Sequence, residues 1–444
     1  MTASYRIGAG SGFAGDRIEP AATLAERCDL DALVFECLAE RTIGLAHQRM
    51  THEDAAGFDP AFLQRLRAVL PTLPAKTKLL TNAGAADPRG LAREIQRELA
   101  EHAHPRSLSI AAVFGDDVID VLPGSAQILG TDMTVADLGD RIVSANAYIG
   151  AAAAVAALDE GADIVVTGRM GDAALFAAPI LHHFNADPDS PDAAAAPTLI
   201  GHLLECAGQL TGGYFADGIR KTVPDLAHLG FPFAGVESDG SAEFRKPENT
   251  GGVLSRETVL EQLLYEIDDP RCYQTPDTTL DFTPVLIQET GPNRVRVSGV
   301  RSTGRPQQLK VSIGVMDGYL AAGSIAYAGH AALERAQLAL AIVSERWESV
   351  HDRPASELRL DLQGANSLRP WTQPPHAPAE VRARIGIRSF DPGVPALLRR
   401  ELESLYTNGP SGGGGVEFSS SQTVGIVSAL IDRDLVQPRF EMMR

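Results

Sequence analysis

The feature of this sequence that most constrains its fold is an alternation of short apolar runs with helical patterns in the N-terminal part. Because the runs are apolar on both faces and helical patterns separate them, they are typical of a parallel sheet that helices cover on both sides. We therefore predict an α/β domain with a mostly parallel sheet and helices on both faces. Its expected strands cover residues 5–10, 31–36, 76–82, 107–115 and 162–168.

An Ala-rich helix is expected over residues 138–160, and a further helix over residues 197–211. After the second helix comes a glycine-rich stretch, and beyond it the alternation of strands and helices ends. Beyond this junction, strands joined by short turns predict an antiparallel meander within an α+β domain. We place the α/β domain, which holds the site, at residues 1–225, and the α+β domain, which covers the site, at residues 226–444. The meander strands are expected over residues 281–289, 293–301, 307–318 and 319–329.

Charge and cysteine usage narrow the partners and the compartment. The formal net charge of −18 would repel nucleic-acid phosphates and anionic membrane surfaces, and no run of clustered Lys and Arg offsets it. The four cysteines have neither a CxxC pair nor zinc-like spacing, which favours a reducing compartment. Neither a signal sequence nor a stretch of about eighteen apolar residues is present. We therefore expect a cytoplasmic protein with no nucleic acid or membrane as partner.

Polar residues follow the expected parallel strands at the points where each strand ends. In open parallel sheets, ligands bind outside the carboxyl ends of the strands, so these residues form the candidate site. We assign catalysis to four acidic residues, namely Glu36, Asp116, Asp117 and Asp172. We assign substrate binding at the same edge to Gly10, Ser11, Gly12, Asn82 and Arg169.

The glycines after the first strand match a nucleotide-binding pattern only in part. Gly10, Gly12 and Gly15 fit GxGxxG, and Glu36 follows at about the distance of a ribose-binding acid. A dinucleotide fingerprint needs a helix that begins inside the glycines, whereas Pro20 is the natural first residue of the helix here. Three interpretations stay open: a nicotinamide or flavin site, a tight turn without a ligand, and a backbone nest for an anion, a thioester oxygen or a phosphate.

The charged residues at the strand ends each have a chemical and a structural interpretation. Asp116 and Asp117 could hold Mg²⁺ or act as acid and base in a dry cleft, or one of them could cap the helix that follows. Arg169 offers a planar fork for a carboxylate or a phosphate, or it could form a structural ion pair with Asp172.

Two further patterns are weighed and set aside. His202 and Glu205 lie three residues apart on one helix face, but a third ligand is missing, so we assign no metal site. The sequence has no GxSxG motif, and neither Cys37 nor Cys206 has an obvious base beside it. A covalent nucleophile is therefore not expected.

A set of short blocks occurs along residues 7–330, namely GAGSGFAGDRIEPA, LVFECLAERTI, TNAGAADP, VSANAYIGA, IVVTGRMGDAAL, HLLECAGQLTGGYFAD, KPENTGG, EQLLYEIDDP and RVRVSGVR. As a set, they resemble the acyclic terpene utilisation AtuA family. The resemblance implies a role beside acyl-CoA enzymes that degrade branched terpenoid or related carboxylates, and blocks that line one site, with Asn146 of VSANAYIGA among the substrate-binding residues. Longer relatives look like the same core fused to a small ferredoxin-like domain, so that module is expected either as a separate small subunit or not at all.

Three functions follow from these observations, and we prefer the first. It is an enzyme of branched or terpenoid acyl-CoA or carboxylate catabolism that acts by addition, elimination or hydrolysis, with a coenzyme A thioester as substrate and Mg²⁺ as a candidate cofactor. The second is a non-catalytic acyl-CoA-binding or scaffold subunit, and the third is a nicotinamide-dependent oxidoreductase. We expect a homo-oligomer in which Tyr214 and Lys246, on two glycine-rich loops, offer aromatic surface and a cation to the ligand.

Overall fold

The computed structural model describes residues 4–50, 56–101, 107–368 and 378–443. The chain forms two compact units, one made of Met1–Val315 with Ile426–Arg444 and the other of Met316–Gly425. This division differs from the boundary predicted at residue 225, because strands that follow that residue extend the first sheet instead of starting a separate domain.

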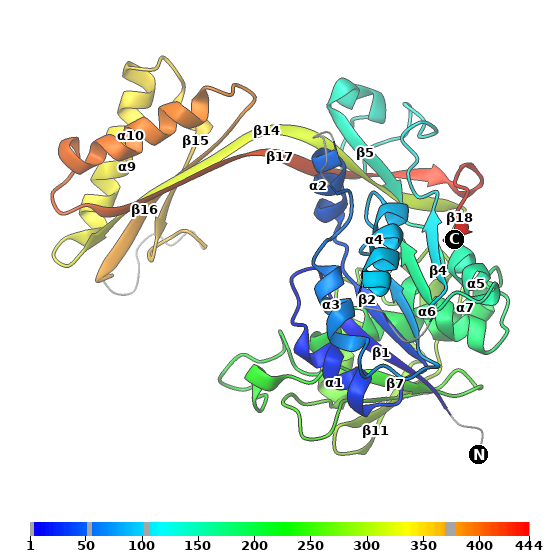
Figure 1. The fold of residues 1–444 in the computed structure, drawn as a ribbon. Coiled ribbons are helices and arrows are strands. Elements are labelled where there is room, and N and C mark those ends of the chain that lie inside the picture. The colour runs from blue at the N-terminus through cyan, green and yellow to red at the C-terminus, as the bar shows by residue number, and fades with distance from the viewer. Residues whose placement is uncertain (1–3, 51–55, 102–106, 369–377, 444) are drawn as a thin grey trace. The chain divides into compact units, whose positions relative to one another are not determined.

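A ten-stranded sheet is the framework of the first unit, with the order β11-β12-β8-β7-β1-β2-β3-β6-β4-β18 among the described residues (Figure 1). Its centre consists of the five predicted parallel strands, β1 (Tyr5–Gly12), β2 (Ala32–Glu36), β3 (Lys78–Thr81), β6 (Ile164–Thr167) and β4 (Ile110–Phe114). Antiparallel strands flank this centre, namely β7 (Phe233–Val236), β8 (Ala242–Arg245), β11 (Leu286–Gly291), β12 (Arg294–Ser298) and β18 (Arg439–Met442). The predicted mostly parallel α/β sheet is confirmed.

Helices cover both faces of the parallel centre (Figure 1). The connections from β1 to β2, β2 to β3 and β3 to β4 all run in one direction across the sheet, whereas the connection from β4 to β6 runs back. Because crossovers between parallel strands are right-handed, the reversal moves the later helices to the opposite face. One face carries α1 (Glu19–Arg27), α3 (Phe62–Val69) and α4 (Pro88–Glu101), and the other carries α5 (Ala152–Asp159), α6 (Asp172–His183) and α7 (Pro191–Leu204).

The reversal also fixes where a ligand can enter. The chain leaves β3 toward one face and leaves β6, its neighbour in the sheet, toward the other, so the loops part at the carboxyl ends of these strands. Such a switch point is the usual place of a binding crevice in an open parallel sheet. Two smaller helices border this region, α2 (Glu40–Met50), which contacts β5, and α8 (Arg256–Leu263), which packs on α7.

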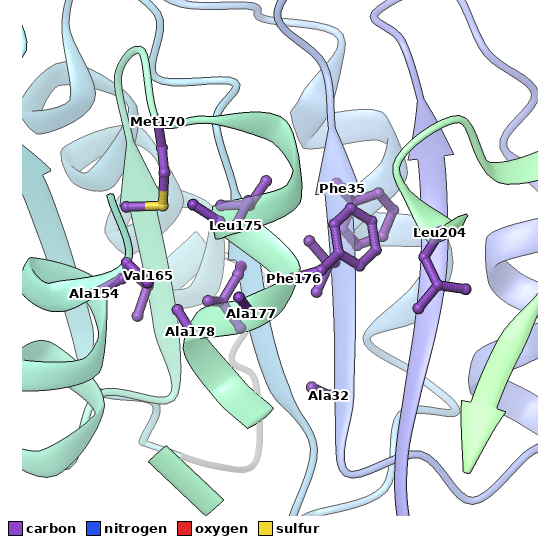
Figure 2. Close-up of a cluster of buried hydrophobic side chains, with 14 of the residues drawn as sticks. Ala32, Phe35, Ala154, Val165, Met170, Leu175, Phe176, Ala177, Ala178 and Leu204 are labelled. Carbon is purple, nitrogen blue, oxygen red and sulfur yellow. The ribbon is translucent and has the colours of Figure 1, made fainter. Parts of the chain in front are cut away.

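The main hydrophobic core lies between the sheet and these helices. All five residues of β2 and all four of β6 are buried, as expected for strands with helices on both sides. Figure 2 shows Leu175 and Phe176 of α6 among the side chains of the sheet, near Phe35 of β2. From Ala173 to Leu181, α6 is buried on every side, so its apolar residues show no helical periodicity.

The helix predicted over residues 138–160 is wrong in its first half. That half forms a short 3₁₀ helix (Val135–Arg141) and β5 (Ile142–Ala147), which pairs antiparallel with β14 (Gln308–Ala328). The helix proper, α5, begins only after Gly150, where the buried carboxylate of Asp277 accepts the N–H of Ala151 at 3.0 Å. Pairing with a long neighbouring strand therefore makes residues 142–147 extended, whereas the Ala-rich run after Gly150 is helical as predicted.

The two meander strands predicted over residues 307–318 and 319–329 are one strand, β14. Gly318, placed in the expected turn, has a φ of +74°, and a Cβ there would lie 2.6 Å from the carbonyl oxygen of Ser389. Glycine thus lets the chain approach its neighbour, β16, and continue past an irregularity without turning.

The second unit is an antiparallel sheet with two helices, which agrees with the predicted α+β character. The strands are β15 (Leu358–Gln363), β16 (Glu380–Ser389), and parts of β14 and of β17 (Gly414–Asp432). Helices α9 (Ala332–Ser349) and α10 (Val394–Asn408) enclose a separate core around the fully buried Trp347.

Two observations complete the fold. A small sheet in the first unit consists of β9 (Tyr273–Gln274), β10 (Thr279–Asp281) and β13 (Arg301–Ser302). None of the helices among the described residues has the length and apolarity needed to cross a bilayer.

Candidate active site

A cavity of about 1330 Å³ opens at the carboxyl ends of the parallel strands, and all residues that line it belong to the first unit. The residues that follow β1, β2 and β6 form its base, and segments beyond residue 200 form much of its wall. Five of the predicted site residues line it, namely Gly12, Glu36, Arg169, Asp172 and Tyr214. Its apolar lining includes Leu38, Leu129, Leu229, Phe231, Ile267, Leu309 and Leu430.

Glu36, the last residue of β2, is the most deeply buried carboxyl of the cavity, with 5% of its surface exposed. Its Oε1 accepts hydrogen bonds from the N–H of Leu38 at 2.7 Å and from Nδ2 of Asn82 at 3.0 Å. Its Oε2 has no hydrogen-bond partner among the described residues and is the oxygen left for the cavity. Burial, followed by the nearby charge of Asp172, raises the pKa of Glu36 to about 8, although both hydrogen bonds oppose the rise.

Ser11 and Asn82 lie behind the cavity wall and hold Glu36 in place. The Ser11 hydroxyl donates to the carbonyl oxygen of Glu36 at 2.7 Å, and Oδ1 of Asn82 accepts the N–H of Cys37 at 2.7 Å. Both side chains are fully buried and neither lines the cavity. They therefore orient the turn after β2, and their assignment to substrate binding stays a prediction without a contact to support it.

Arg169 follows β6 with its side chain only 1% exposed. Nη1 donates to the carbonyl oxygen of Leu38 at 2.7 Å, and Nη2 donates to that of Met170 at 3.1 Å and to the carboxylate of Asp172. The guanidinium carbon lies 4.3 Å from the ring centroid of Tyr148. Arg169 thus fixes the turn that carries Glu36 and forms an ion pair with Asp172. These contacts favour the second of its two interpretations, the structural ion pair, over the binding of a ligand.

Asp116 and Asp117 do not form a joint site. The buried carboxylate of Asp116 accepts the N–H of Arg169 at 2.8 Å and Nδ2 of Asn146 at 3.0 Å, and burial raises its pKa. Asp117 is exposed, and its carboxylate accepts the N–H of Ile119 two residues on. Neither these acids nor Asn146 line the cavity. Within the described ranges, no group of three or more His, Cys, Asp or Glu side chains is arranged to hold a metal ion.

The glycine loop is explained by packing and by an internal carboxylate. A Cβ at Gly10 would lie 2.6 Å from the ring of Phe35, and one at Gly12 would lie 2.5 Å from the backbone of Cys206. The N–H of Gly12, which an external anion would need, donates to the carboxylate of Asp16 at 2.9 Å. Because α1 begins only at Glu19, its N-terminus lies several residues beyond this loop, unlike the helix of a dinucleotide fingerprint.

His202 and Glu205 of the α7 region form a buried proton-sharing pair on another wall of the cavity. Nε2 of His202 donates to the carbonyl oxygen of Leu263 at 3.1 Å, so the contact of 3.0 Å between Nδ1 and Oε1 of Glu205 contains one proton. Burial by itself lowers the pKa of His202, but the hydrogen bonds to Glu205 and Leu263 raise it overall. In the part of the chain that the structure describes, Oε2 of Glu205 is buried without a hydrogen-bond partner.

The cavity has a polar cluster near its mouth. Tyr148 donates to the Glu40 carboxylate at 2.7 Å, and Nζ of Lys310 pairs with the same oxygen at 2.6 Å. Tyr214 lines the cavity and is 85% exposed, whereas Nζ of Lys246 donates to the carbonyl oxygen of Thr250 at 2.7 Å and does not line it. The ligand-binding roles of Tyr214 and Lys246 stay predictions.

Sequence reasoning assigned no role to four residues of this cavity, namely Tyr148, His202, Glu205 and Lys310. Tyr148 lies in the block VSANAYIGA, only two residues beyond Asn146. The spacing of His202 and Glu205 is visible in the sequence, but there it suggests a metal motif and not a proton-sharing pair. Lys310 gave no signal, because nothing in a strand pattern tells which end of the strand reaches a site.

Comparison with known proteins gives a family match. A family model described as "Acyclic terpene utilisation family protein AtuA" matches residues 5–442, which is nearly the whole chain. No curated protein and no solved structure matches the chain.

Proposed function

This chain belongs to the acyclic terpene utilisation AtuA family, and from that premise we propose that it is an enzyme that adds water to, or eliminates it from, a branched terpenoid acyl group. The substrate is a branched acyl-CoA or the corresponding carboxylate, with a carbon–carbon double bond next to the acyl carbonyl. The observation that carries this proposal is Glu36, a buried carboxyl with one oxygen held by two donors and the other open to the cavity.

Glu36 has the properties of a group that both takes and gives a proton. A general acid or base works best when its pKa lies near the working pH, and burial brings the pKa of Glu36 into that range. In the addition, the Glu36 carboxylate takes a proton from water while the water oxygen bonds to the β-carbon. The π electrons move to the α-carbon and the acyl oxygen, and the Glu36 carboxyl then gives its proton to the α-carbon. The net change is the addition of one water, and elimination is the reverse.

The thiols of the cavity region favour this chemistry over covalent hydrolysis. Burial, together with the nearby charge of Glu205, raises the pKa of Cys206, so its thiol is protonated at neutral pH. Burial raises the pKa of the Cys37 thiol to about 12. Neither cysteine therefore offers the thiolate that a nucleophilic mechanism needs.

The remaining space suits a branched acyl chain. The volume of about 1330 Å³ exceeds that of a typical small-ligand pocket, and its lining combines leucines and aromatic rings with a few polar groups. Branched apolar chains gain free energy from burial against such side chains, in proportion to the apolar area removed from water.

Turnover of a matched panel tests the proposal. The full chain is incubated with the α,β-unsaturated coenzyme A thioester of a branched acyclic terpenoid acid, its free acid, and a straight-chain thioester of equal length. We expect a product heavier by one water from the branched substrate, formed more slowly from the straight chain. Release of free thiol would indicate hydrolysis instead. Binding without any turnover would contradict the proposal and favour a non-catalytic acyl-CoA-binding subunit.

A further inference from the structure

We infer that the acyl group enters the deep part of this cavity uncharged, as a thioester, and that the free carboxylate is not the substrate. The inference rests on the proposed function and selects between its two substrate classes. It follows from how the charged groups at the base of the cavity are already paired.

The cation at the base of the cavity is already occupied. Both terminal nitrogens of Arg169 donate to carbonyl oxygens, of Leu38 and Met170, and one of them also pairs with Asp172. Nε of Arg169 has no partner among the described residues, but it is shut off from solvent and so from a ligand in the cavity. The negative charge of Asp172 already neutralises the guanidinium, so a carboxylate ligand would gain little attraction from Arg169.

The second cationic group is also occupied. His202 donates from Nε2 to the carbonyl oxygen of Leu263 and shares the proton on Nδ1 with Glu205. Both ring nitrogens are therefore engaged. The pair carries no net charge in either distribution of its proton, so it does not attract an anion.

The other groups at the base are themselves acidic. The two hydrogen bonds of Glu36 among the described residues both go to Oε1, and Oε2 of Glu205 is buried there without a partner. Asp172 lies close enough to raise the pKa of both carboxyls. A second anion buried beside them would lose its hydration without gaining a cation. A neutral thioester carbonyl has no such cost, and it can accept a hydrogen bond from a protonated carboxyl.

Cationic side chains that are open to solvent lie at the mouth of the cavity. Arg41 is exposed, Arg17 is exposed and donates to the carbonyl oxygens of Leu226 and Ala227, and Lys310 is 45% exposed and paired with Glu40. The anionic part of a coenzyme A thioester is therefore expected at the mouth, and only its acyl end at the base. The cavity thus has cations at its mouth, where the coenzyme A part of a thioester would bind, and, among the described residues, no unpaired cation at its base, where a free carboxylate would need one.

Binding of three ligands that share one branched acyl group tests the inference without turnover. Isothermal titration calorimetry with the full chain measures Kd for the coenzyme A thioester, the uncharged pantetheine thioester and the free carboxylate. We expect the pantetheine thioester to bind at least tenfold more tightly than the carboxylate. A carboxylate that binds as tightly as the pantetheine thioester, or more tightly, overturns the inference.

The variant Asp172→Asn tests whether pairing of Arg169 with Asp172 is what weakens the binding of a carboxylate. The variant keeps the shape of the side chain but releases Arg169 from its carboxylate partner, so the carboxylate ligand should gain at least tenfold in affinity while the pantetheine thioester changes little. Asp120→Asn, at an exposed aspartate that does not line the cavity, is the matched control and should leave both affinities unchanged. Thioester binding by Asp172→Asn shows that the variant is folded, and an unchanged carboxylate affinity in that folded variant overturns the role of Asp172. A wild-type thioester that binds without turnover would contradict the proposed function and leave this inference standing.

Discussion

Replacing Glu36 with Gln is expected to lower kcat about 10²- to 10⁴-fold, the usual contribution of a positioned general acid or base. Glutamine keeps an oxygen that accepts the hydrogen bonds from Leu38 and Asn82, so only the atom that faces the cavity changes. KM is expected to change little, because the fold of the turn is preserved. Steady-state kinetics on the branched thioester checks both constants.

The matched control is Glu40→Gln, a second glutamate of the same cavity. Glu40 is paired with Lys310 and Tyr148, and these partners lower its pKa although partial burial opposes them, so it is a weaker base than Glu36. Its replacement should alter kcat only a few-fold. In the wild type, kcat/KM should rise with pH and level off above about 8, where Glu36 is ionised. Equal losses of kcat in the two variants would contradict the assignment.

Glu36→Gln, which should lower kcat, is expected to raise the stability of the fold. The folded protein keeps a proton on Glu36 between the ordinary pKa of 4.5 and the raised value of about 8, whereas the unfolded chain has lost it. The free energy of unfolding therefore falls as pH rises through this window. Gln does not titrate, so Glu36→Gln should be more stable than the wild type by a few kcal/mol above pH 8 and by little at pH 5, given about 1.4 kcal/mol per unit of pKa. Chemical denaturation at both pH values measures the difference.

Replacing Arg169 with Met is expected to destabilise the protein by roughly 3–5 kcal/mol, the cost of breaking a buried ion pair from one side. The change leaves the carbonyl oxygens of Leu38 and Met170 and the carboxylate of Asp172 without their donor. Activity should fall as well, because the Leu38 carbonyl anchors the turn that carries Glu36. Denaturant unfolding and kcat are measured on the same preparations.

Two further variants show whether loss of the Arg169–Asp172 ion pair causes the destabilisation. Arg41→Met removes an exposed arginine from the mouth of the cavity and should change the unfolding free energy by no more than about 0.5 kcal/mol. The double variant Arg169→Met with Asp172→Asn removes the uncompensated charge and should recover part of the loss. A single variant as stable as the wild type would show that Arg169 does not hold this site together.

The parallel centre of the fold could be predicted because its signal is local. Strands buried on both faces read as continuous apolar runs, and β2 and β6 are buried throughout. The error over residues 138–160 has a non-local cause. β5 is a strand because it pairs with β14, more than 150 residues later in the chain, and no window of sequence contains that partner.

The sequence predicts at which edge of the sheet the site lies, but not which side chains face the cavity. Glu36, Asn82 and Asp116 all lie at the carboxyl ends of parallel strands, yet Glu36 faces the cavity while the other two are held in the wall by hydrogen bonds. Strand periodicity does not predict those bonds. His202 and Lys310 reach the cavity from elements far along the chain, so their place depends on tertiary packing alone.

Solvent deuterium transfer tests the proton-transfer role of Glu36 most directly. The branched thioester is incubated in D₂O with equal amounts of the wild type or Glu36→Gln, and NMR follows deuterium at the carbon next to the acyl carbonyl. We expect the wild type to place one deuterium there in a single configuration, and the variant to do so at least 100-fold more slowly, in keeping with the loss of a general acid or base. Deuterium transfer at the same rate by the folded variant would contradict the proton-transfer role of Glu36.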